Sequence, residues 1–134
     1  MLIWEINSAA QLTQIAANVL GGEIQAKQGH FDEAIRFLNH AKEIEEGLMY
    51  QEPPDWFFST RHTLGHILLQ AKKFGEAEKV YREDMVTYPE NGWALMGLYK
   101  SLLGQKKNKE ASAVMNRFNK AWKWADVRIN SSRI

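Results

Sequence analysis

The stretch from Thr63 to Pro89 constrains the fold of this chain most strongly, because small and apolar residues recur in it at helical spacing. Gly65 falls within a first predicted helix, while Ala77 and Tyr81 fall one turn apart within a second. The closing Pro89 ends the unit, since proline lacks the backbone N–H that a helix interior needs. These positions predict one helix-turn-helix hairpin.

The neighbouring stretches repeat this hairpin. A shift of 34 residues superposes Ala111 on Ala77, whereas Ala34 aligns with Ala77 only at an interval of 43 residues. Nine extra residues therefore separate the first unit from the second. The predicted organisation is a single domain, 1–134, with repeats at 15–48, 58–91 and 92–125, an insertion loop at 47–55 and a C-terminal tail at 125–134.

The order of small, aromatic and proline residues resembles the tetratricopeptide repeat, a helical hairpin of about 34 residues. The stretches RHTLG, EAEKVYREDM and PENGW resemble the C-terminal repeats of longer bacterial proteins of that family, and the resemblance covers roughly residues 15–124. It implies an all-α fold of three hairpins with six main helices. It also implies a right-handed superhelix, in which the first helix of each hairpin lines a concave groove.

Composition limits the function classes. The chain has 134 residues, 45% of them hydrophobic, which is enough to bury one core. The sequence contains no cysteine, which excludes a disulfide framework, a thiolate nucleophile and a cysteine-ligated zinc site. No apolar run approaches the roughly 18 residues of a membrane-spanning helix. We therefore expect a cytoplasmic protein without a membrane partner.

Charge is distributed unevenly along the chain. Residues 1–50 carry a net charge of −4, residues 51–90 a net charge of −2 and residues 91–134 a net charge of +7. A positive last third is able to attract an acidic protein or a nucleic acid. Lys106, Lys107 and Lys109 fall in a predicted inter-helix turn, however, and no recognised nucleic-acid module accompanies them. We expect a solvated helix face there and no nucleic-acid partner.

Local signals place the helix ends. Ser8 and Gln11 have the spacing of a capping box at the start of a first helix that extends to about Gln28. Gly21-Gly22 lies inside this helix at a cost of roughly 1 kcal/mol per glycine, which predicts close approach of the partner helix. That partner helix is expected over 31–46.

The insertion interrupts the repeat at Pro53-Pro54, because proline restricts the residue before it as well as its own position. Asp55 is the predicted cap of a helix that begins near Trp56, and Asn91 is the predicted cap of the first helix of the third unit. The insertion and the residues after it also carry apolar side chains: Met49, Tyr50, Phe57 and Phe58. This loop is expected either to cover the groove as a lid or to pack against the backs of neighbouring helices.

The register of the repeat also selects the residues that line the groove. Side chains spaced three to four residues apart share one helical stripe. The selected positions are Glu23, Lys27, His62, His66, Gln70, Trp93, Met96 and Lys100. Their mixture of acidic, imidazole, aromatic and basic groups predicts a peptide site, with aliphatic groups of the ligand against Trp93 and Met96 and carboxylates near Lys27 or Lys100.

Asp84 is the least expected residue of the second unit. It aligns with Ala41, on the inner face of a second helix, where a carboxylate needs a partner because an unpaired buried charge is very costly. Arg61 and His62 are the predicted partners. Two interpretations stay open: a structural contact that locks helix to helix, or a functional polar pocket built from Arg61, His62, Glu83 and Asp84.

The leading interpretation is a non-catalytic module that binds a peptide or protein segment in the groove. The alternative is a small-molecule or metal-binding module that uses Arg61, His62, His66 and Asp84. His62 and His66 are spaced i and i+4, and Glu23 is a conceivable third ligand, but the glutamate of the HExxH motif is missing, so no metal and no cofactor are predicted. Self-association through exposed ends, at Trp4 and at 122–124, is a third interpretation.

Overall fold

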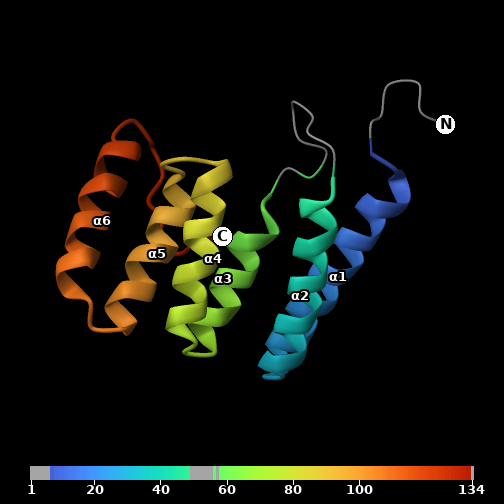
Figure 1. Ribbon diagram of the computed structural model, residues 1–134. Helices are drawn as coiled ribbons and strands as arrows, with labels where there is room; N and C mark the ends of the chain where they lie inside the picture. Colours follow the sequence, from blue (N-terminus) through green and yellow to red (C-terminus); the bar gives the residue numbers. More distant parts are fainter. Residues whose placement is uncertain (1–6, 49–55, 57, 134) are drawn as a thin grey trace. The chain divides into compact units, whose positions relative to one another are not determined.

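The computed structural model describes residues 7–48, 56 and 58–133 of this chain, and every regular element in these ranges is a helix. The six helices are α1 (Ala9–Lys27), α2 (Phe31–Glu46), α3 (Thr60–Gln70), α4 (Phe74–Thr87), α5 (Gly92–Gly104) and α6 (Asn108–Ala121) (Figure 1). The predicted all-α class with six helices is therefore confirmed. The right-handed superhelix stays a prediction. Within the described residues, no helix combines the length and the apolar character needed to cross a bilayer.

The contacts of the chain group it into two compact units, Met1–Thr60 and Arg61–Ile134. The first unit contains α1 and α2, and the second contains α4, α5, α6 and nearly all of α3. Each unit has its own internal packing.

In the first unit, the predicted capping box at the start of α1 is present. Ser8 Oγ accepts a hydrogen bond from Gln11 N at 3.2 Å, and Gln11 Oε1 accepts one from Ser8 N at 3.1 Å. Gly22 is buried against α2, where a Cβ on this residue would lie 2.7 Å from Leu38 Cγ. The close approach that Gly21-Gly22 predicted is therefore real, because no side chain fits at Gly22.

The start of α3 differs from its prediction. The helix begins at Thr60 and not near Trp56. The Glu45 carboxylate accepts hydrogen bonds from the backbone N–H of Thr60, at 2.9 Å, and from its hydroxyl group, so a side chain from the end of α2 satisfies this early N–H group. This long-range cap was not predicted from the sequence.

The insertion loop falls largely outside the described residues. Asp55, the predicted cap, belongs to that part, as do Met49, Tyr50, Pro53, Pro54 and Phe57. The alternatives of a lid and of packing against helix backs therefore stay predictions. At the end of the loop, Trp56 is half-buried and Phe58 is exposed.

The second unit is built around the ring of Tyr81, which is fully buried. A Cβ on Gly65 of α3 would lie 2.4 Å from Tyr81 Cζ, and a Cβ on Gly97 of α5 would lie 2.1 Å from the same atom. Atoms do not approach so closely, so the ring requires glycine on both flanking helices. The aromatic and glycine positions of the hairpin pattern thus describe one packing contact that joins α3, α4 and α5.

The same kind of contact recurs along α5. Gly92 lies under the Trp122 ring and Gly104 lies under the Phe74 ring, where an added Cβ would come within 2.2 and 2.4 Å of ring atoms, respectively. The predicted cap at Asn91 is confirmed, because its Oδ1 accepts from Trp93 N at 2.9 Å and from Ala94 N at 3.3 Å. Three close approaches along one helix explain how α5 is buried so deeply between its neighbours.

The chain after α6 folds back on the second unit. Trp122 stacks on Phe118 with ring centroids 5.7 Å apart and meets Trp93 edge-on at 5.7 Å. Its Nε1 donates to Val127 O at 2.7 Å, and the tail then returns past α5 towards α3 and α4 (Figure 1). Trp124 is not part of this packing and is 88% exposed.

Replacing Gly97 with alanine is expected to destabilise the second unit by at least about 2 kcal/mol, because the added methyl group overlaps the Tyr81 ring. Urea unfolding followed by tryptophan fluorescence measures the effect. Gly75→Ala is the matched control, since a Cβ at this site on α4 meets only Gln105 Oε1, at 4.0 Å. The control is expected to leave the free energy of unfolding unchanged or raise it by up to about 1 kcal/mol. Equal stability of the two variants would contradict the tight slot around Tyr81.

Candidate functional site

The returning tail lies on a surface that we call the tail-binding face, formed by His62, Thr63 and His66 of α3 and by Tyr81 of α4. Ser132 of the tail lies at its centre and is only 2% exposed. Ser131 and Arg133 are half-buried on either side of it. A segment of the chain whose described residues form neither helix nor strand is thus held against helices of the second unit.

A short chain of hydrogen bonds fixes Ser132. Its Oγ donates to the backbone carbonyl of His62 at 3.0 Å and lies 2.5 Å from the phenol oxygen of Tyr81. A serine hydroxyl has one hydrogen to donate, and the carbonyl of His62 can only accept. Tyr81 must therefore donate to Ser132. Burial raises the pKa of Tyr81 above its usual range, which keeps the phenol protonated for this role.

The residues on either side of Ser132 make further side-chain contacts. Ser131 Oγ lies 2.9 Å from His66 Nδ1, and the Arg133 guanidinium donates to Thr63 Oγ1 at 3.0 Å. Arg133 is half-buried, and this burial lowers the pKa of its guanidinium. Three successive tail residues are therefore contacted by three residues of α3.

The sequence explains why these groups converge. His62 and His66 are one helical turn apart and share a face of α3. Tyr81 belongs to another helix, but its hydroxyl reaches the same surface because the glycines on α3 and α5 leave room for the ring between them. The tail-binding face therefore depends on packing as well as on spacing along one helix.

Asp84 is fully buried, and the structure pairs it with His62. Nε2 of the imidazole lies 2.7 Å from Asp84 Oδ2, which joins α3 to α4 through one of the two partners expected from the sequence. The other imidazole nitrogen, His62 Nδ1, is buried and makes no hydrogen bond within the described structure. His62 thus contacts α4 with its side chain and the tail with its backbone carbonyl.

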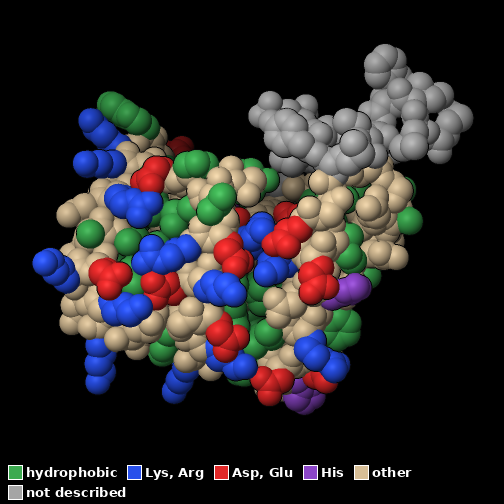
Figure 2. All heavy atoms as spheres, in the orientation of Figure 1, with side chains coloured by type: hydrophobic (Ala, Val, Ile, Leu, Met, Phe, Trp, Pro, Cys, Tyr) green, Lys and Arg blue, Asp and Glu red, His purple; other side chains and the backbone are tan. Residues whose placement is uncertain are grey.

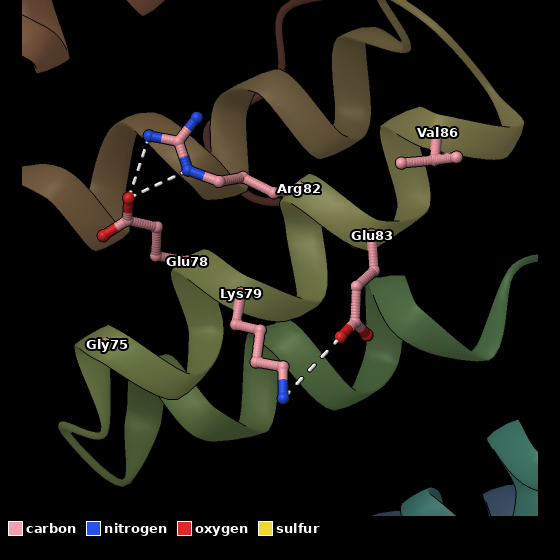
Figure 3. A pocket seen from close by; sticks show the side chains of 6 residues that line it. All are labelled: Gly75, Glu78, Lys79, Arg82, Glu83 and Val86. Carbon is pink, nitrogen blue, oxygen red and sulfur yellow. Dashed lines mark hydrogen bonds and ion pairs between the residues drawn. The ribbon is translucent and has the colours of Figure 1, made fainter.

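Arg61 and Glu83 are the remaining members of the predicted polar cluster. Arg61 is half-buried next to His62 in sequence. Glu83 forms an ion pair with Lys79 at 3.9 Å along α4 (Figure 3). This pair lies on the outward stripe of α4, whereas Asp84 is buried.

The predicted groove residues have different environments in the two units. In the first unit, Glu23 is half-buried and Lys27 is exposed. In the second unit, Gln70 and Lys100 are exposed, whereas Met96 is buried in the core. The remaining three are engaged: Trp93 with Trp122, His66 with Ser131, and His62 with Asp84.

The described residues contain no group of three or more histidine, cysteine, aspartate or glutamate side chains that could hold a metal ion. This finding covers His62 and His66, the two histidines of the metal hypothesis. The His62 imidazole contacts Asp84 and the His66 imidazole contacts Ser131, so both rings take part in hydrogen bonds within the protein.

A shallow, open depression of about 400 Å³ lies along the outer side of α4. The described residues that line it all belong to this helix: Gly75, Glu78, Lys79, Arg82, Glu83 and Val86 (Figure 3). Arg82 pairs with Glu78 at 2.8 Å, and Lys79 pairs with Glu83 at 3.9 Å, so the charges of the stripe compensate one another. Acidic and basic side chains are also interspersed over this side of the second unit (Figure 2).

Glu78 is the most strongly perturbed carboxylate of this stripe. Burial raises its pKa, but hydrogen bonds from Lys107, Gln105 and Arg82 outweigh the burial and lower the pKa to about 2. Lys107 Nζ and Gln105 Nε2 lie 2.9 and 2.7 Å from Glu78 Oε2. The carboxylate thus ties α4 to the turn between α5 and α6, which is a structural role.

Several residues of the contact between the tail and the tail-binding face were not predicted from the sequence. Ser131, Ser132 and Arg133 lie in a tail without periodicity, and Thr63 was read only as a helical residue. Tyr81 was identified as a packing residue, while its hydroxyl contact was not predicted. The available signal was the pair of adjacent serines in the tail, but this pattern does not name a partner surface.

Comparison with known protein families and with curated proteins finds no match to this chain.

Asp84→Ala is expected to lower the free energy of unfolding by about 3 kcal/mol, because removing one partner of a buried pair leaves the other without compensation. Asp84→Asn keeps an acceptor oxygen for His62 Nε2 and is expected to lose less. Glu83→Ala, at the adjacent and partly exposed position, is the control and is expected to cost under about 1 kcal/mol. Chemical denaturation followed by circular dichroism compares the variants. A loss from Asp84→Ala no larger than that of the control would refute the locking role.

Glu78→Gln is expected to destabilise the protein by an amount on the order of 2 kcal/mol at neutral pH. The folded-state pKa of Glu78 is lowered, so its stabilising effect is complete above the ordinary value of 4.5 and disappears as the pH falls towards about 2. The difference between wild type and variant should therefore shrink below about pH 4.5. Urea unfolding at a series of pH values tests this, with the exposed Glu76→Gln as control. A difference that is independent of pH would count against the charged network.

Proposed function

We propose that this chain is a non-catalytic protein-protein interaction module that binds a peptide segment of a partner on the tail-binding face and the surface next to it. The observation that carries this proposal is the tail itself: an irregular peptide lies on α3 and is held through Ser132, its most buried residue. A surface that holds one irregular segment by side-chain hydrogen bonds has the chemistry required for another.

The resemblance to the tetratricopeptide repeat supports the same location. In that family the first helix of each hairpin lines the groove, and α3 and α5 occupy those positions in the second unit. Gln70 continues the stripe of His62 and His66 along α3 and is exposed, as is Lys100 on α5. These two side chains offer polar contacts beyond the part that the tail covers.

The other interpretations receive less support from the described residues. The imidazoles expected to hold a small molecule or a metal ion contact Asp84 and Ser131 instead. Trp122 packs within the second unit and Trp4 lies outside the described residues, so self-association through the described end would rest on the exposed Trp124. We propose a cytoplasmic location on the absence of cysteine from the sequence, and no nucleic-acid partner.

The proposal is tested by selecting binders to the purified chain from a random peptide library and measuring their affinity by calorimetry. The double variant Gln70→Ala/Lys100→Ala is expected to weaken a selected peptide by about tenfold, because it removes both exposed polar contacts of the surface. The matched control is Lys109→Ala/Lys120→Ala on α6, which should leave the affinity unchanged. Failure to recover a binder, or an equal loss in both double variants, would overturn the proposal.

A further inference from the structure

We propose that the tail-binding face recognises a segment with two consecutive small hydroxyl residues followed by a basic residue, and that Ser131, Ser132 and Arg133 occupy it as a built-in ligand that a partner must displace. This inference rests on the proposed function and specifies both the chemistry of the partner and the regulation of the site.

The centre of the face selects a hydroxyl group. The Tyr81 phenol donates to the position of Ser132 Oγ, and the His62 carbonyl accepts from the same position. A hydroxyl oxygen can accept one hydrogen bond while donating another, whereas a carboxylate only accepts and an ammonium group only donates. Because this position is 2% exposed, the ligand side chain must also be small.

The two neighbouring positions add direction to this preference. His66 Nδ1 meets a hydroxyl group on one side of the central serine, and Thr63 Oγ1 accepts from a guanidinium on the other. Arg133 N also donates to Ser131 Oγ at 3.3 Å, which holds the two outer residues in one compact bend. The order hydroxyl, hydroxyl, cation therefore matches the order of groups on the face.

The way in which the tail is held favours a displaceable ligand. The side chains of Ser131, Ser132 and Arg133 make hydrogen bonds with α3 and α4, each of which contributes modestly to stability. Its advantage over a free peptide is the covalent connection, which gives it a high effective concentration at the face. A partner segment that adds contacts with Gln70 or Lys100 gains affinity that the tail does not have, and this gain allows it to compete.

The experiment uses a fluorescent synthetic peptide of residues 126–133, DVRINSSR, titrated with the full chain and followed by anisotropy. Ser132→Asp in the full chain is expected to expel the tail, because a carboxylate cannot donate to the His62 carbonyl and is costly to bury. The peptide should then bind this variant at least about tenfold more tightly than the wild type, whose face is already occupied.

Asn130→Asp is the matched control, because it adds the same charge to an exposed residue of the same tail and is expected to keep wild-type affinity for the peptide. A peptide in which Ser132 is replaced by aspartate is expected to lose binding to the Ser132→Asp chain. If Ser132→Asp loses its helical circular dichroism, Ser131→Ala/Arg133→Ala replaces it. That variant buries no charge and is expected to bind the peptide about threefold more tightly than wild type.

Two results would overturn the inference: equal affinity of the peptide for wild type, Asn130→Asp and the tail-releasing variant, or no binding to a folded tail-releasing variant. These failures are separable from failure of the proposed function. A library peptide that binds wild type and Ser132→Asp equally well, and depends on Gln70 and Lys100, would refute only the inference that the tail is a built-in ligand. If the tail peptide binds Ser132→Asp but no library binder is recovered, only the proposed general peptide-binding role would be refuted.

Discussion

The second unit depends on the slot that holds the ring of Tyr81. Gly65 and Gly97 leave space for the ring on α3 and α5, and the ring in turn fixes how closely those helices approach α4. Because interiors are packed as tightly as organic crystals, a single methyl group on either glycine would displace the contact. The slot also carries the phenol oxygen through the helix layer to the surface where Ser132 lies. One side chain therefore serves both the core and the tail-binding face.

The helices and their ends were largely predictable, because their causes are local. The Ser8 capping box, the Asn91 cap and the order of six helices follow from residues within one turn of each boundary. The buried position of Asp84 was also accessible, since alignment of the repeats placed a carboxylate where a small residue belongs. Because the hairpin is repeated, Asp84 could be compared with Ala41 at the equivalent position of another repeat.

The features that sequence reasoning missed involve residues far apart in the chain. The start of α3 was misplaced because Glu45, at the end of the preceding helix, caps Thr60. The tail-binding face was missed because Ser132 pairs with Tyr81 and with His62, residues that no periodicity relates to an irregular segment. His62 likewise makes two contacts that the sequence does not reveal: its side chain bonds Asp84, and its backbone carbonyl accepts from the tail. Both depend on the packing of α3 against α4 and the tail.

The turn held by Trp122 affects how quickly the tail would rebind the tail-binding face after release. The indole N–H donates to Val127 O, and the Trp122 ring packs against Phe118 and Gly92, so this fixed point lies only five residues before Ser132 in the chain. Loops of about ten residues close within roughly 10–100 ns. If the tail detaches as proposed, it would re-encounter α3 far sooner than a dilute partner arrives by diffusion. Partners that exchange with the tail would have to outlast this rapid return, so the lifetime of their complex, more than the speed of their arrival, decides whether the chain stays engaged.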